Sequence, residues 1–165
     1  MKILIVTDAW QPQVNSVATT LAELVRQLQI SGHEVVVIQP GQFRTRPCPG
    51  FPSLQIAWFP GARLRELMDS AEAHAIHIAT EGPLGWAARR HCLRRRWPFT
   101  TAFHTKFPEI LKDTFGLPVS WGYALLRCFH RPSSGVMAPS QGVLNMLEAR
   151  DSARHFGWGS ADRKS

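Results

Sequence analysis

The sequence is poor in features that would indicate a disulfide-stabilised, metal-binding or membrane-spanning protein. Its three cysteines, Cys48, Cys92 and Cys128, lie far apart. An odd number of cysteines without a close pair argues against a disulfide framework and against a cysteine-rich zinc site. No apolar run approaches the roughly 20 residues of a membrane span, and the run at residues 3–6 is too short for the apolar core of a signal peptide. We therefore expect a cytoplasmic protein.

The composition is that of a globular protein with an excess of positive charge. The chain has 165 residues, of which 44% are hydrophobic and 19% charged, and its net charge is +7. These fractions argue against a disordered chain. The length suits one domain, and a domain of this size buries roughly 70% of its unfolded surface, so it needs no disulfide or metal in order to fold.

Hydrophobic periodicity predicts strands and helices in alternation. Short apolar runs predict strands at residues 3–6, 35–38, 54–59, 74–79, 99–103 and 135–138. Helical spacing and capping signals predict helices at residues 17–30, 64–71, 83–97, 121–131 and 141–150. A long surface loop is expected at residues 39–52, and residues 111–118 are either irregular or a short helix. The alternation predicts an α/β protein with a doubly wound, mostly parallel sheet.

Three loops that follow predicted strands form the candidate site. They comprise residues 7–16, 80–83 and 104–108, and in a parallel sheet they lie at the same edge. The first loop contains no glycine, which excludes a dinucleotide-binding fingerprint and a P-loop. The helix behind it begins near Asn15 or Ser16, and either side chain can cap it. Because a helix N-terminus offers unpaired N–H groups to an anion, we expect a site for a phosphorylated compound there.

Single residues of these loops have more than one interpretation. Asp8 and Asn15 either border the site or serve only turn geometry and capping. His104 follows a strand and is placed to hydrogen-bond a substrate hydroxyl or to share a charge, unless it only caps or packs. Glu81, in the first turn of a helix, complements the helix dipole whatever else it does.

Basic residues gather beside aromatic residues in two places. One group comprises Arg89, Arg90, Arg94, Arg95 and Arg96 beside Trp97, and the other comprises Arg63 and Arg65 near Trp58 and Phe59. Such a group is usually a solvated face, but it also attracts anionic lipid head groups. Nucleic-acid binding is disfavoured, because no recognition motif accompanies the charge.

Three segments resemble, in order, conserved blocks of a family of retaining glycosyltransferases with the GT-B fold, known as family 4. They are KILIVTDAWQPQVNSVATTLAELVRQLQISGHEVVVIQP, IHIATEGPLGWAARRHCLRRRWPFTTAFHTKFPE and SWGYALLRCFHRPSSGVMAPSQGVLNMLEAR. The resemblance points to bacterial α-mannosyl- and glucosyltransferases that use sugar nucleotides. It implies that residues 1–150 are the N-terminal, Rossmann-like, acceptor-side half of a GT-B fold, and that residues 151–165 are a divergent, poorly ordered tail.

The resemblance also implies a reaction. A hexosyl group passes from a sugar nucleotide, such as GDP-mannose or UDP-glucose, to a lipid or glycan acceptor with retention of configuration, and neither a cofactor nor a metal is bound. Asp8, Asn15, Ser16, Glu81 and Gly82 would lie on the donor-phosphate side of the cleft, and His104 would contact the transferred sugar. Ser16 stands where the family usually has glycine, which alone enters positive φ freely and permits the closest backbone approach.

The resemblance stops before the donor-binding domain, so that the chain looks truncated. We expect little or no turnover by this chain alone, and contact with a membrane only at its surface, on the inner face. The alternative is a non-catalytic remnant or interaction module that pairs with a separate donor-binding domain. A flavodoxin- or response-regulator-like domain is a third interpretation, but the absence of a paired-acid loop after the first strand and the count of six predicted strands argue against it.

Overall fold

The computed structural model describes residues 1–13, 15–103 and 107–137 of the chain. They belong to two compact units, Met1–Phe99 and Thr100–Ser165. The prediction of one domain over residues 1–150, with a tail from residue 151, stays a prediction. That tail and the helix expected at residues 141–150 lie outside the described residues.

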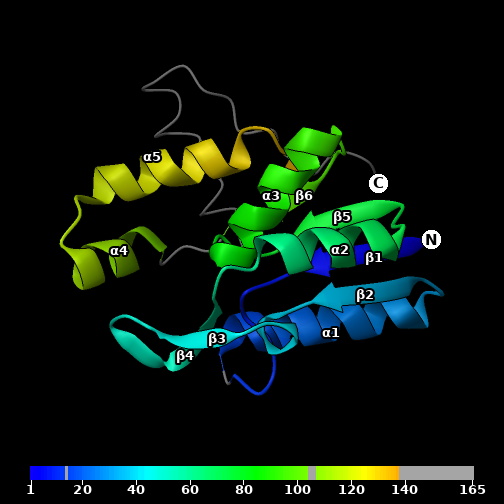
Figure 1. Ribbon diagram of the computed structural model, residues 1–165, viewed down its shortest axis with the longest axis horizontal. Helices are drawn as coiled ribbons and strands as arrows, with labels where there is room; N and C mark the ends of the chain where they lie inside the picture. The colour runs from blue at the N-terminus through cyan, green and yellow to red at the C-terminus, as the bar shows by residue number, and fades with distance from the viewer. Residues whose placement is uncertain (14, 104–106, 138–165) are drawn as a thin grey trace. The chain divides into compact units, whose positions relative to one another are not determined.

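A parallel arrangement of three strands forms the centre of the first unit (Figure 1). β1 (Lys2–Val6) pairs in parallel with β2 (Glu34–Ile38) on one side and with β5 (Ala75–Ile78) on the other. β1 is deeply buried, and both Leu4 and Val6 are 0% exposed. Its uninterrupted apolar run is typical of a parallel strand that is covered on both faces.

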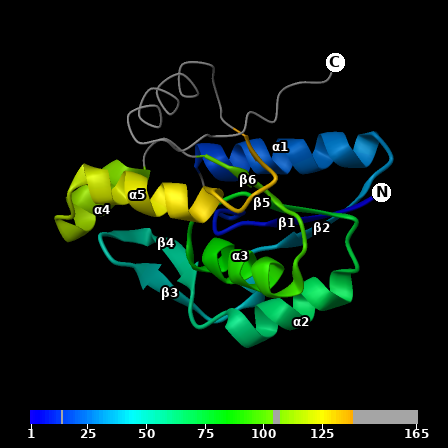
Figure 2. The same cartoon turned by 90° about the horizontal axis from the view of Figure 1, so that it is seen from above.

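Helices cover both faces of these strands, as Figure 2 shows. α1 (Ser16–Ile30) lies on one face, where its Leu21 packs in the same apolar cluster as Ile5 of β1. α2 (Gly61–Ala71) and α3 (Pro83–Arg95) lie on the other face. Both faces of β1 are therefore buried, because alternate residues of a strand point to opposite sides. The prediction of a doubly wound, Rossmann-like α/β fold is confirmed.

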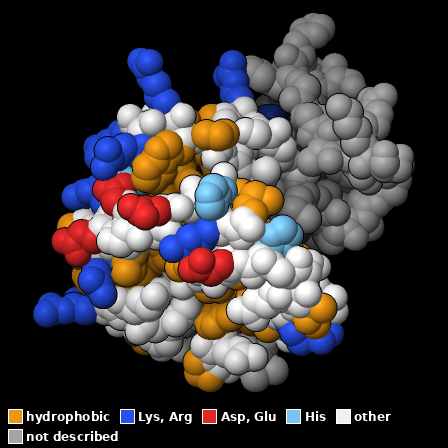
Figure 3. All heavy atoms as spheres, turned by 90° about the vertical axis from the view of Figure 1, so that its right-hand side faces the viewer, with side chains coloured by type: hydrophobic (Ala, Val, Ile, Leu, Met, Phe, Trp, Pro, Cys, Tyr) orange, Lys and Arg blue, Asp and Glu red, His pale blue; other side chains and the backbone are white. Residues whose placement is uncertain are grey.

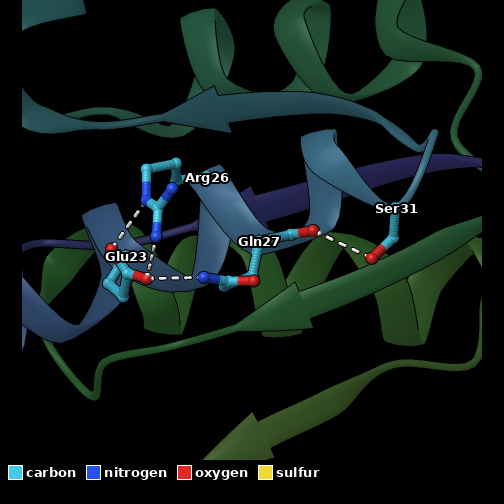
Figure 4. A network of polar contacts seen from close by, with 4 residues as sticks. All are labelled: Glu23, Arg26, Gln27 and Ser31. Atoms are coloured by element: carbon cyan, nitrogen blue, oxygen red, sulfur yellow. Dashed lines mark hydrogen bonds and ion pairs between the residues drawn. The ribbon is translucent and has the colours of Figure 1, made fainter.

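The outward face of α1 carries a local network of polar contacts (Figure 4). The Glu23 carboxylate accepts two hydrogen bonds from the Arg26 guanidinium, at 2.9 and 2.7 Å, and one from the Gln27 amide at 2.7 Å. These contacts lower the pKa of Glu23 to about 2, with the Arg26 hydrogen bonds as the main cause. The Ser31 hydroxyl donates to the Gln27 carbonyl oxygen at the helix end. Because the network is exposed to solvent, it adds little to stability.

The expectation of a surface loop at residues 39–52 is wrong. The segment holds a short 3-10 helix (Pro40–Gln42) and strand β3 (Thr45–Cys48), which pairs antiparallel with β4 (Phe51–Ala57) in a separate two-stranded sheet. The strand predicted at residues 54–59 corresponds to β4, and it belongs to this hairpin instead of the parallel sheet. The four prolines of the segment predict a loop instead of a strand. Proline lacks an N–H group, but a two-stranded sheet has only edge strands, where proline is tolerated.

The second unit also has parallel strands. β6 (Thr100–Ala102) pairs in parallel with β7 (Gly135–Met137). Phe103, the residue directly after β6, packs in one buried cluster with Tyr123 and Leu126. These two strands match the predictions at residues 99–103 and 135–138.

Two helices, α4 (Phe107–Phe115) and α5 (Val119–His130), connect these strands. α4 resolves the alternative left open for residues 111–118 in favour of a helix, and it begins inside the loop predicted at residues 104–108. A Cβ on Gly122 would lie 2.8 Å from the Cα of Pro108. The glycine therefore permits the close approach of α5 to α4. Among the described residues, no helix is both long enough and apolar enough to span a bilayer.

Candidate functional site

The first two predicted loops leave neighbouring strands of the first unit. Val6 at the end of β1 lies opposite Ile78 at the end of β5. The pairing continues one step further, because the Ala79 N–H donates to the Val6 carbonyl oxygen at 2.8 Å. The loop after β1 and the turn before α3 are therefore held side by side at the carboxyl edge of the strands, where open α/β sheets bind their ligands.

Asp8, the second residue after β1, contacts the first turn of α3. Its carboxylate accepts hydrogen bonds from the backbone N–H groups of Leu84, at 2.8 Å, and Gly85, at 3.2 Å. It accepts a further bond from the Thr80 hydroxyl at 2.7 Å, and another from the backbone of Gly82. The residue is only 8% exposed. Asp8 therefore binds the N–H groups that a helix start leaves without a helical partner.

The Thr80 hydroxyl completes this arrangement. It accepts a hydrogen bond from the Asp8 backbone N–H at 2.6 Å while it donates to the Asp8 carboxylate. Asp8, Thr80, Gly82, Leu84 and Gly85 are called the Asp8 cluster below. Asp8 is thus joined by hydrogen bonds to residues 72 to 77 positions away in the sequence.

Two glycines of the Asp8 cluster make room for these contacts. A Cβ on Gly82 would lie 2.4 Å from the Asp8 carboxyl carbon, and a Cβ on Gly85 would lie 1.8 Å from the Thr80 carbonyl oxygen. Neither position can hold a side chain without movement of its neighbours. Gly82 is also the N-cap residue of α3, with Pro83 next to it in the first turn, as the sequence predicts.

The electrostatic environment of Asp8 contains opposing effects. Burial raises the pKa of the Asp8 carboxyl above its ordinary value, because desolvation disfavours the charged form. The hydrogen bonds from Leu84, Thr80, Gly85 and Gly82 oppose this shift. Burial is the larger effect, so that the net shift of the pKa is upward.

The start of α1 has a different construction. Asn15 is its N-cap, and the side-chain oxygen accepts a hydrogen bond from the Ala18 N–H at 2.8 Å, which confirms one of the two predicted caps. Ser16 is the first helical residue and is exposed. Among the described residues, the non-glycine positions with positive φ are Phe59, Glu72 and Arg96. The serine at position 16 thus occupies an ordinary helical conformation. A glycine is therefore not needed at this position to reach positive φ.

The other predicted site residues are only partly placed. Glu81 is buried, with 5% of its surface exposed, directly before the N-cap of α3. The prediction that it lies in the first turn is therefore wrong, because the helix begins at Pro83. His104 lies outside the described residues, and its role stays a prediction. Thr80 lies in a loop that the sequence predicts for the site but was not assigned a role there, and Leu84 and Gly85 lie outside the predicted loops. For Thr80 and Gly85 a weak signal exists, since a threonine and a glycine flank a helix start, whereas the contribution of Leu84 is a backbone N–H that any residue supplies.

A second arrangement of charged residues lies between α2 and α3, at a hollow of about 440 Å³. Asp69 of α2 binds two residues of α3, His91 at 2.8 Å and Arg95 at 2.8 Å. Arg65 and Arg94 also line the hollow. The hydrogen bond from His91 is the main cause that lowers the pKa of Asp69. One face of the molecule shows acidic and histidine side chains among the basic ones, so that charges of both signs mix there (Figure 3).

The fold and the loops together define a Rossmann-like α/β protein with its candidate site at the carboxyl edge of the parallel strands. The profile of glycosyltransferase family 4 matches residues 17–155. The chain belongs to this family, and the resemblance seen in the sequence is confirmed.

Three curated proteins are similar to the chain. Two are GDP-mannose-dependent alpha-mannosyltransferases, from Mycobacterium tuberculosis and Mycolicibacterium smegmatis, each 24% identical over 96% of the chain and 47% of the relative. The third is an alpha-monoglucosyldiacylglycerol synthase of Streptococcus pneumoniae, 27% identical over 89% of the chain and 37% of the relative. The chain therefore spans less than half the length of these relatives.

Proposed function

We propose that the chain is the acceptor-side half of a glycosyltransferase that moves a hexosyl group from a sugar nucleotide to a lipid or glycan acceptor, with retention of configuration. The observation that supports this most directly is family membership over residues 17–155. The names of the relatives favour GDP-mannose or a glucosyl donor, and the glucosyl relative is named for a diacylglycerol product.

The donor phosphates are assigned to the start of α1. In the first turn of this helix, Asn15 caps the Ala18 N–H, while Ser16 presents an exposed hydroxyl. The remaining N–H groups of the turn suit the negative charge that develops on a leaving diphosphate. Asp8, Glu81 and Gly82 are assigned to the wall of the cleft beside it.

His104 is assigned to the transferred sugar. It follows β6 in the sequence, and a histidine there can donate to or accept from a sugar hydroxyl. The proposed reaction uses no resident metal or cofactor, since basic side chains and backbone dipoles can stabilise a diphosphate leaving group.

Catalysis is proposed to need a second, donor-binding domain, because the relatives are more than twice as long as the matched region. That domain would lie either in the same protein or in a separate chain. The proposed function includes contact with the cytoplasmic membrane surface through Trp58 and Phe59, the two exposed residues directly after β4. Arg46 of β3 stacks on the Trp58 ring there, at 4.1 Å.

Two assays test the proposal. The purified chain is incubated with GDP-mannose or UDP-glucose and lipid or glycan acceptors, and we expect no transfer. The chain is then joined to the C-terminal half of the Mycobacterium tuberculosis relative, and we expect mannosyl transfer with an α-linked product detected by NMR. A joined protein that folds and binds GDP-mannose but transfers nothing to any acceptor would contradict the enzymatic proposal.

The alternative is a non-catalytic module that binds a separate donor domain. The observation in its favour is that the chain matches less than half of each relative. Co-purification of the 165-residue chain with a separately expressed C-terminal half, without transfer activity in the complex, would support this alternative.

A further inference from the structure

The Asp8 cluster uses most of the hydrogen-bonding capacity of a buried carboxylate within the protein. An ionised carboxylate offers roughly four acceptor positions. The Asp8 oxygens accept from the Thr80 hydroxyl and from the backbone N–H groups of Gly82, Leu84 and Gly85. Among the described residues, these contacts take up most of the acceptor positions of Asp8 and leave little capacity for a substrate hydroxyl.

Direct contact between Asp8 and the donor is disfavoured for two further reasons. The side chain is almost fully buried, so that a ligand cannot reach it without opening the cluster. A carboxylate also accepts hydrogen bonds without donating any, and would repel a diphosphate at short range. The residue therefore has to act through the groups that it holds.

The groups that Asp8 holds belong to two different loops. Through its backbone it continues the β1 exit loop, which ends seven residues later at the Asn15 cap of α1. Through its carboxylate it binds the turn of Thr80 and Gly82 and the start of α3. Gly82 and Gly85 allow this approach, because a Cβ at either position would collide with the cluster.

We propose that Asp8 is a positioning residue, which fixes the loop that ends at Asn15 against the turn that holds Glu81 and Gly82, and so sets the spacing between the helix start assigned to the donor phosphates and the cleft wall beside it. The inference rests on the proposed function for its catalytic consequence, but not for its structural one. It changes the role of Asp8 from part of the cleft wall to a support for the residues that line the cleft.

The structural part is tested on the chain itself by amide hydrogen exchange. In Asp8→Asn, half of the acceptor oxygens become an NH₂ group that faces N–H donors. We expect exchange at Leu84 and Gly85 to accelerate at least tenfold, and exchange at Ala18, beyond the Asn15 cap, to accelerate about threefold. The matched control is Asp69→Asn, which removes a carboxylate that binds α3 at His91 and Arg95, and it should leave Ala18 and Leu84 unchanged. Unchanged exchange at Ala18 in Asp8→Asn would overturn the proposal.

The catalytic part is tested in the chain joined to the donor-binding half, with Thr80→Val as the deciding variant. This change keeps the shape of the side chain but removes the hydroxyl that bridges the Asp8 N–H and carboxylate. If Asp8 acts by positioning, Thr80→Val and Asp8→Asn should both raise the KM for GDP-mannose and lower kcat, by about tenfold each. The double variant should lose little more than either single variant, because both changes break one network.

The possible results separate the two proposals. A rise in KM with Asp8→Asn alone, and none with Thr80→Val, would mean that Asp8 contacts the donor, and would overturn the inference. Normal kinetics in both variants, despite faster exchange at Ala18, would overturn it too. If the unsubstituted joined protein transfers no sugar, the proposed function fails, while exchange at Ala18 still decides whether Asp8 positions the loops.

Discussion

The helices that follow β1 and β5 begin in opposite ways. α3 starts against a buried carboxylate from another loop, and the Asp8 cluster closes its first turn. α1 starts with its own cap, Asn15, followed by the exposed Ser16. Each helix start has the same positive end of its dipole. The difference shows that the chain neutralises one start internally and leaves the other accessible, which is why the donor phosphates are assigned to α1.

The largest expected effect comes from adding a methyl group in the first turn of α3, beside the Asp8 cluster. Gly85→Ala would place a Cβ 1.8 Å from the Thr80 carbonyl oxygen, and the backbone atom cannot move aside easily. We expect the free energy of unfolding to fall by about 3 kcal/mol, measured by urea denaturation. Gly61→Ala at the start of α2 is the matched control, since its nearest neighbour is the flexible Arg65 guanidinium at 3.6 Å. Equal effects of the two changes would contradict the close packing at α3.

Replacing the Asp8 carboxyl group at the start of α3 should have a smaller effect. Asp8→Asn leaves N–H groups of the Asp8 cluster without acceptors, and a buried unsatisfied donor costs about 2 kcal/mol. We expect a loss of that size in chemical denaturation at pH 7. A stability equal to that of the unsubstituted chain would show that the hydrogen bonds to Leu84 and Gly85 do not hold the turn.

The stability of the chain should be less sensitive to substitutions at the start of α1. Asn15→Ala removes the acceptor of the Ala18 N–H, and loss of an N-cap typically costs about 1 kcal/mol. Thermal unfolding followed by circular dichroism measures the change. Asn15→Asp keeps an acceptor oxygen and should remain close to the unsubstituted chain. A loss with Asn15→Asp as large as with Asn15→Ala would mean that position 15 does more than cap.

Ser16→Gly should change little at this same start. Because Ser16 already has a helical conformation, a glycine relieves no strain, and its lower helix propensity costs about 0.5 kcal/mol. Transfer activity of the chain joined to a donor-binding half should not rise. A clear increase would show that the serine side chain obstructs the approach of the phosphates.

The smallest effect is expected towards the far end of α3, where Asp69 binds His91 and Arg95. The pKa of Asp69 in the folded chain lies below its ordinary value of 3.8. Its contribution is therefore fully present above that pH, and is lost as the pH falls through the lowered pKa. Since the group is partly exposed and its pairs are screened by solvent, we expect about 0.3 kcal/mol. Thermal unfolding of Asp69→Asn and the unsubstituted chain should differ less at pH 3 than at pH 6.

Local sequence signals predicted much of the fold because they act over a few residues. The apolar run of β1, the spacing of Leu21 and its neighbours in α1, the Asn15 cap and Pro83 at the start of α3 all depend on nearby positions. The hairpin of β3 and β4 was missed, because its prolines favour a loop locally, whereas the strands form by pairing with each other.

The sequence by itself determined the alternation of strands and helices, the family resemblance, and the loops in which a site would lie. The tertiary structure alone decided what Asp8 does. Its partners are 72 to 77 residues away, and one of them, Leu84, contributes a backbone N–H group that leaves no trace in the choice of side chain. Only the parallel pairing of β1 with β5 brings these groups together, because it places the ends of the two strands at one edge of the sheet.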